Sequence, residues 1–249
     1  MRKVEHIRLR NGMTVNELVR QMDAAEVLGA GKIGEAAKLI SEMFSDRDYT
    51  VFLTLAGALV PAGFRRIIGD LVKNEHVHVL VSTGANMVHD MVEALGYKHI
   101  VGSFTAEDRK LKKENIGRIG DIYVEQEAFQ ALEKWLYTTV ETIPEEKRRR
   151  ISAAEILQEI GKQIKDEESI LAIAARQKVP IICPAFIDSI AGFQLWMLGQ
   201  DEVLRIDPFL DVGILMDKVY EAKKVGMIIL GGGVPKHFAL FANTFREGV

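Results

Sequence analysis

Residues 77–86, VHVLVSTGAN, decide the fold, because a short β-branched, apolar run leads directly into a turn of small residues. A helical pattern of apolar residues follows from Met87 to Leu95. Strand, tight turn and helix in this order form the repeating unit of an α/β fold. The stretch therefore predicts one strand-turn-helix unit.

The same order recurs at three other places, with strands predicted at 49–54 (YTVFLT), 180–183 (PIIC) and 227–230 (MIIL). Residues 49–54 are apolar on both faces, as in a strand of a parallel sheet that helices cover on both sides. Short connections between such strands and helices force right-handed crossovers. We therefore predict an α/β protein with a doubly wound, Rossmann-like parallel sheet, helices on both faces and an N-terminal helical segment.

The N-terminal helical segment is predicted to span residues 1–47 of a single Rossmann-like domain, 1–249. Thr14 and Glu17 have the spacing of a capping box at a helix start. Gly29-x-Gly31-x-x-Gly34 lies between two helical patterns rather than after a strand, so we predict a helix-helix turn there.

The middle of the chain gives weaker signals. Residues 96–120 are predicted to be irregular, 122–124 to form a short strand, and 145–150 to be a solvated charge run. Helices are predicted at about 152–164 and 167–177, and from about Pro208 to Lys224.

Composition excludes several classes of protein. The 249 residues are 48% hydrophobic and 27% charged, which suits one large core and excludes disorder and disulfide-stapled miniproteins. A net charge of −3 disfavours nucleic-acid binding. The single Cys183 suits a reducing compartment, and no apolar run approaches the roughly 18 residues of a membrane span. We expect a cytoplasmic protein that binds neither nucleic acid nor membrane.

Four turns could carry chemistry: 55–58 (LAGA), 82–86 (STGAN), 185–189 (AFIDS) and 231–233 (GGG). In doubly wound sheets ligands bind at the carboxyl ends of the strands, where such turns gather. Small side chains let backbone N–H groups approach a ligand, and helix N-termini favour phosphate. Asp188 at a strand end could accept hydrogen bonds from a ribose. The pattern indicates a nucleotide-like site.

Each turn also has a structural interpretation. The three glycines could only provide room for strand-helix packing, Thr83 could be an N-cap, and Asp188 could cap a helix beside Ser189. Lys236 and His237 could simply face solvent. The six histidines show no metal-ligand spacing, and neither a Walker loop nor a Gly-x-Ser-x-Gly elbow occurs, so we predict no metal site and no serine hydrolase.

Five blocks together resemble the deoxyhypusine synthase family in order and spacing. The resemblance extends over residues 15–249, and the blocks are 51–54 (VFLT), 79–86 (VLVSTGAN), 115–120 (NIGRIG), 180–188 (PIICPAFID) and 226–237 (GMIILGGGVPKH). It implies an NAD-dependent aminobutyl transferase that works as a homotetramer with sites at subunit interfaces. In that family NAD oxidises spermidine, an enzyme lysine captures the butylimine, and a lysine of the hypusine-bearing translation factor receives it.

The resemblance also implies roles for individual residues. His237 corresponds to a histidine of the polyamine pocket. The implied cofactor contacts are Thr83, Gly84, Ala85, Asp188, Gly231 and Gly232. No metal ligand is implied.

The sequence departs from the family pattern at several site positions. Gly57 and Ala58 replace Ser-Asn, His89 replaces a glutamate of the cofactor site, Phe193 an aspartate of the polyamine site, and Phe241 an asparagine. These changes leave open a related transferase that acts on a small amine, as in homospermidine synthesis.

The family's nucleophilic lysine lies in a Trp-Gly-Lys segment, which residues 1–249 do not contain. Lys236 corresponds to a different lysine. We therefore expect that the sequence lacks a C-terminal portion of the natural protein; a non-catalytic paralogue is the alternative.

Overall fold

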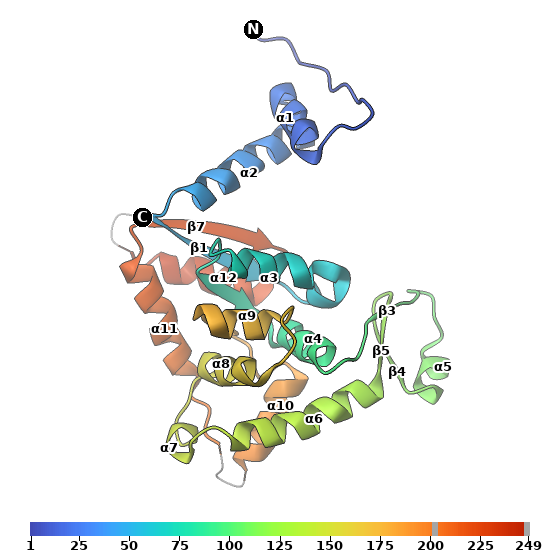
Figure 1. Cartoon of the computed structure of the whole chain (residues 1–249), viewed down its shortest axis with the longest axis vertical. Coiled ribbons are helices and arrows are strands. Elements are labelled where there is room, and N and C mark those ends of the chain that lie inside the picture. Colours follow the sequence, from blue (N-terminus) through green and yellow to red (C-terminus); the bar gives the residue numbers. More distant parts are fainter. Residues whose placement is uncertain (201–203, 247–249) are drawn as a thin grey trace. The chain divides into compact units, whose positions relative to one another are not determined.

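The computed structural model describes residues 1–200 and 204–246 (Figure 1). The chain divides into two compact units, Met1–Tyr49 and Thr50–Val249. The first contains two helices, α1 (Val15–Ala25) and α2 (Leu28–Ser45). The predicted capping box is confirmed, because Glu17 N donates to Thr14 Oγ1 at 3.2 Å and Thr14 N donates to Glu17 Oε2 at 2.9 Å.

The prediction of a turn at Gly29–Gly34 is wrong, since these glycines lie inside α2. The chain reverses at Glu26, whose φ is 56°. A Cβ on Gly31 would lie 2.6 Å from the carbonyl carbon of Glu26, and one on Gly34 would lie 2.4 Å from the Cα of Asp23. The glycines therefore serve the close approach of α1 and α2, a contact that the spacing of the glycines does not reveal.

The second unit is built on a four-stranded sheet with the order β6-β2-β1-β7. β1 pairs with β2 in parallel, with Phe52 opposite Val79, and β2 pairs with β6 in parallel, with Leu80 opposite Ile181. The strands are β1 (Tyr49–Leu55), β2 (Val79–Ser82), β6 (Ile181–Ile182) and β7 (Lys224–Leu230). All four were predicted, and the parallel sheet is confirmed.

Helices pack on both faces of this sheet (Figure 1). Leu53, Leu80 and Ile181 belong to a core cluster with α3 (Arg65–Lys73), α4 (Gly84–Ala94), α6 (Gln126–Glu141), α8 (Ala153–Gln163), α9 (Ile170–Gln177) and α10 (Ile190–Gly199). Phe52, Val79 and Ile182 belong to a second cluster with α11 (Pro208–Glu221) and α12 (Gly233–Asn243). Successive residues of a strand thus face opposite layers, which confirms the doubly wound architecture.

Residues 96–120 are not irregular, so that prediction is wrong. They contain β3 (Ile100–Val101), the exposed helix α5 (Asp108–Lys113) and β4 (Ile116–Ile119). The predicted strand at 122–124 is β5 (Ile122–Glu125), which pairs antiparallel with β3 and β4 in a separate three-stranded sheet. Strands of two to four residues give little periodic signal. The two-residue loop Gly120-Asp121, with Gly120 at φ 64°, was the available hairpin signal.

Two short helical segments complete the described elements. The turn η1 (Val60–Phe64) leads into α3, and α7 (Glu145–Arg148) lies in the predicted charge run. Among the helices of residues 1–200 and 204–246, none has the length and apolarity that crossing a bilayer requires.

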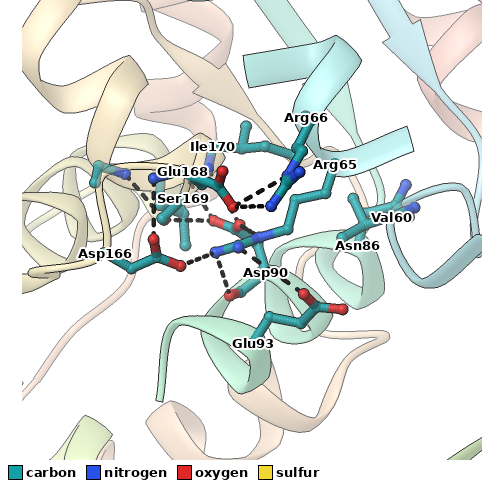
Figure 2. A network of polar contacts seen from close by, with 12 residues as sticks. Val60, Arg65, Arg66, Asn86, Asp90, Glu93, Asp166, Glu168, Ser169 and Ile170 are labelled. Carbon is teal, nitrogen blue, oxygen red and sulfur yellow. Dashed lines mark hydrogen bonds and ion pairs between the residues drawn. The ribbon is translucent and has the colours of Figure 1, made fainter. Parts of the chain in front are cut away.

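A buried carboxylate joins three helices of the second unit (Figure 2). Asp90 of α4 is fully buried and accepts a hydrogen bond from Arg65 Nε of α3 at 2.7 Å. It also accepts from Ser169 Oγ at 2.7 Å and from the first two backbone amides of α9 at 3.1 and 2.9 Å. Arg65, whose side chain is 8% exposed, has a second partner in Asp166 at 2.8 Å. Both carboxylate oxygens of Asp90 thus have hydrogen-bond partners, and Arg65 pairs with the carboxylate.

Asp90→Ala should lower the free energy of unfolding by about 3–5 kcal/mol, because it leaves the buried Arg65 without its main partner. Asp70→Ala, on the exposed face of α3, is the matched control and should stay within about 0.5 kcal/mol of wild type. Chemical denaturation measures both. Equal stability of the two variants would show that Asp90 does not hold the three helices together.

Candidate functional site

The four turns singled out in the sequence meet at one cleft of about 290 Å³. Its walls come from the turn after β1, the turn after β2, the segment after β6 and the start of α12. The lining residues are Ala56, Gly57, Ser82, Thr83, Pro184, Ala185, Asp188 and Gly232 to Pro235. Backbone and small side chains thus make up most of the surface, and Asp188 is the charged residue on it.

The first turn of α4 contributes differently at each position. Thr83 lines the cleft and is also the N-cap, with Oγ1 accepting from the Asn86 N–H at 3.4 Å. Gly84 is buried, and a Cβ there would lie 2.7 Å from Ser189 Oγ. Gly84 therefore allows the start of α10 to approach α4. Ala85 lines a neighbouring cavity rather than the cleft.

Asn86 organises the cleft, a role that the sequence analysis does not predict. Its buried side chain donates from Nδ2 to the Ala56 carbonyl oxygen at 2.9 Å and accepts at Oδ1 from the Val60 N–H at 3.2 Å. The Ala56 N–H in turn donates to the Leu230 carbonyl oxygen at 3.0 Å. The turn after β1 is therefore fixed between α4 and β7. A polar amide inside the apolar pattern of 84–92 was the signal that could have revealed it.

The glycines after β7 separate into two roles. Gly231 has φ 85°, and a Cβ there would lie 2.6 Å from the Cβ of Ala56, so the packing interpretation applies to it. Gly232 is extended, with φ −157°, and lines the cleft; a Cβ there would point into open space, with no neighbour within 4 Å. Of this predicted cofactor-contacting pair, Gly232 is the one that leaves room for a ligand.

In the segment after β6, Ser189 is the N-cap of α10. Its Oγ accepts from the Gly192 N–H at 3.0 Å and donates to the Phe186 carbonyl oxygen at 2.7 Å. Asp188 does not cap α10; its exposed side chain lines the cleft, and its N–H donates to the Ala185 carbonyl oxygen at 3.0 Å. The Asp188 carboxylate is thus placed to accept hydrogen bonds from a ligand in the cleft.

His237 lies elsewhere on α12. It is exposed, is not among the described residues that line the cleft, and stacks on Phe241 with ring centroids 6.0 Å apart. Phe241 in turn contacts Phe245 edge to face at 5.3 Å. Within one chain, the structure therefore does not bring His237 together with Asp188.

The chemistry of the site does not involve a thiolate. Cys183 is fully buried at the end of β6, and burial strongly raises the pKa of its thiol, with Asp211 adding to the effect. In the part of the chain that the structure describes, no group of three or more His, Cys, Asp and Glu side chains is arranged to hold a metal ion. The cleft instead offers backbone groups, two helix N-termini and one carboxylate.

The sequence model described as deoxyhypusine synthase matches residues 17–249. The chain belongs to the deoxyhypusine synthase family. This confirms the resemblance seen in the five sequence blocks.

Relatives in the deoxyhypusine synthase family include two archaeal proteins. The chain is 45% identical to the "probable deoxyhypusine synthase 1" of Methanosarcina acetivorans, over 92% of this chain and 71% of the relative. It is 41% identical to the "probable deoxyhypusine synthase" of Methanothermobacter thermautotrophicus, over 99% of this chain and 80% of the relative. A crystal structure of a "putative deoxyhypusine synthase" from Entamoeba histolytica shares the fold with a TM-score of 0.69, at 20% identity, over 91% of this chain and 78% of that one.

Gly231→Ala should destabilise this deoxyhypusine synthase family protein by about 1–3 kcal/mol, because it combines a positive φ with a collision against Ala56. Gly232→Ala, one residue on, is the matched control and should change stability by less than about 0.5 kcal/mol. Thermal and chemical unfolding compare them. A reversed order would mean that the glycine after β7 is not positioned by contact with the turn after β1.

Proposed function

We propose that the protein catalyses NAD-dependent transfer of the aminobutyl group of spermidine to a lysine of the hypusine-bearing translation factor. The observation that supports this most is the convergence of four strand-end turns, with Asp188, on one cleft. Membership of the deoxyhypusine synthase family supports the reaction class. The Trp-Gly-Lys segment that carries the family's nucleophile is not part of residues 1–249, so the transfer step is proposed for a protein that includes that segment.

The residues of the cleft suit a dinucleotide. The N-termini of α4 and α12 both reach it, and a helix N-terminus favours the negative charge of a pyrophosphate. The open space at Gly232 allows a ligand to approach the backbone, while Asp188 can accept hydrogen bonds from ribose hydroxyls. Bound NAD would supply hydride acceptance from the amine substrate. The chain's own residues would bind and orient it.

The exposed apolar residues support a homo-oligomer, which we propose to be a tetramer. On α10 the side chains of Phe193, Trp196 and Met197 are exposed by 60, 54 and 50%, and those of Phe241 on α12 and Phe245 just after it by 54% each. Burial of aromatic side chains between subunits would be strongly favourable. We further propose that His237, which neighbours Phe241 on α12, contributes to a polyamine site completed by another subunit.

A second candidate function is transfer of the aminobutyl group to a small amine. Phe193 and Phe241 motivate it, because they stand where the family pattern has an aspartate of the polyamine site and an asparagine. We propose the protein acceptor first, because the relatives named above are called deoxyhypusine synthases.

Asp188→Ala should weaken NAD binding by about 1–3 kcal/mol, since a ribose hydroxyl would lose its partner. Asp217→Ala, an exposed carboxylate on α11, should leave the affinity unchanged. Gly232→Val should fold normally, yet lose binding, because its side chain fills the cleft. Isothermal titration calorimetry with NAD measures all three. Unchanged affinity in both cleft variants would place the dinucleotide elsewhere.

Acceptor choice is tested on a form of the protein that carries the Trp-Gly-Lys segment. With labelled spermidine and NAD, we expect label to enter the translation factor and little to enter putrescine. Preferential labelling of putrescine would support the small-amine transferase instead. NADH formation with neither acceptor labelled would contradict both transferase assignments.

A further inference from the structure

A cavity of about 380 Å³, here called the Asp211 cavity, lies apart from the cleft. Its walls come from the segment after β6, from α10, and from the first turns of α8 and α11. Of the described residues that line it, Pro184 alone also lines the cleft. Small-molecule sites usually have volumes of roughly 300–1,000 Å³, so the cavity has room for a ligand of its own.

The walls of the Asp211 cavity are mostly apolar, with one buried carboxylate among them. Phe186, Leu195 and Ile206 contribute apolar side chains. Asp211 lines the same cavity and is only 4% exposed. Apolar walls with a few well-placed polar groups are typical of sites that bind small organic molecules. The cavity therefore has the composition of a ligand site, and Asp211 is its charged group.

Asp211 has hydrogen-bond donors beside it but no cation. Its Oδ1 accepts from the Ala154 N–H at the start of α8 at 2.9 Å. Among the ion pairs of the described residues, none includes Asp211. Burial raises the pKa of the Asp211 carboxyl more than the hydrogen bonds at the start of α8 lower it, and the negative charge of Glu155 raises it further.

Asp90 and Asp211 are both buried carboxylates, but they differ in their partners. Asp90 pairs with the guanidinium of Arg65 at 2.7 Å, whereas the donors of Asp211 at the start of α8 are neutral. A buried charge is costly unless a charge of opposite sign lies beside it. A cation that entered the Asp211 cavity would therefore be strongly attracted to this carboxylate.

The surroundings of Asp211 favour an organic cation over a metal ion. Metal ions such as Ca²⁺ and Mg²⁺ require several oxygen ligands. Within residues 1–200 and 204–246, no group of three or more His, Cys, Asp and Glu side chains is arranged to hold a metal ion. The apolar side chains around Asp211 would instead stabilise the hydrocarbon part of an amine by burying it.

We propose that the Asp211 cavity binds a ligand with one ammonium group and an apolar substituent, with the ammonium paired to Asp211 and the substituent packed against Phe186, Leu195 and Ile206. This ligand differs from spermidine, because spermidine carries more than one ammonium group and the cavity offers one carboxylate among apolar walls. The inference goes beyond the proposed function and does not depend on NAD binding in the cleft.

A matched pair of probes tests the charge of the ligand on the unaltered protein. Phenethylamine carries an ammonium group near pH 7, whereas phenylethyl alcohol has the same ring and chain with a neutral hydroxyl. By isothermal titration calorimetry we expect the amine to bind at least about tenfold more tightly, as for a hydrogen bond to a buried charged group. Equal affinities, or no binding of the amine, would overturn the proposal.

Substitutions on α11 test whether Asp211 is the partner of the amine. Asp211→Asn keeps an amide oxygen that can accept from the Ala154 N–H, but it removes the charge, so the preference for the amine over the alcohol should disappear. Asp217→Asn, at an exposed position of the same helix, is the matched control and should retain the preference. A preference that persists in Asp211→Asn would show that the amine binds elsewhere.

A cavity-filling variant keeps the proposal testable if Asp211→Asn does not fold. Ile206→Trp should abolish binding of phenethylamine, because the larger side chain occupies the cavity, and should leave NAD affinity unchanged. Undiminished amine binding in this variant would overturn the proposal.

Competition with NAD separates the two sites. Saturating NAD should leave the affinity for phenethylamine unchanged. Displacement of the amine by NAD would place the amine in the cleft, which would overturn this inference and leave the proposed function intact. Absence of NAD binding would contradict the proposed function alone.

Discussion

The buried carboxylate of Asp90 constrains much of what surrounds the site. Removing a carboxylate from water is costly unless its oxygens are paired and hydrogen-bonded, and Asp90 meets this requirement with groups from α3 and α9. α4 can neither rotate nor slide without breaking these bonds. These bonds (Figure 2) therefore fix the orientation of α4, and with it the placement of the α4 side chains that line the cleft and the neighbouring cavity.

Helical periodicity gives α4 two separate roles. Asn86 and Asp90, four residues apart, turn toward η1, α3 and α9, and tie the helix to the rest of the fold. Ala85 and His89, also four residues apart, line the cavity beside the turn after β2. Because both pairs lie on one helix, the contacts of the first pair also set the position of the second pair.

The residues proposed for the reaction fall into two groups, those that meet in the cleft of one chain and those on exposed helix surfaces. Asp188, Thr83 and Gly232 come together within a single chain, which accords with a dinucleotide held at strand ends. His237 and Phe193 lie on exposed helix surfaces instead. The lining residues of the cleft thus all come from one chain, whereas the proposed polyamine site would require a second subunit.

The sequence by itself determined the features that depend on neighbours along the chain: the strand-turn-helix units, the capping box of Thr14 and Glu17, and the four turns at the ends of the parallel strands. Tertiary structure decided those that depend on distant residues. The hydrogen bonds of Asp90 with Ser169 and of His89 with His99 form only when the chain folds. Gly231 has a packing role that Gly232 lacks, because Ala56 lies beside it. Local periodicity and capping are encoded within a few residues, whereas a side chain's role is set by whatever the fold places against it.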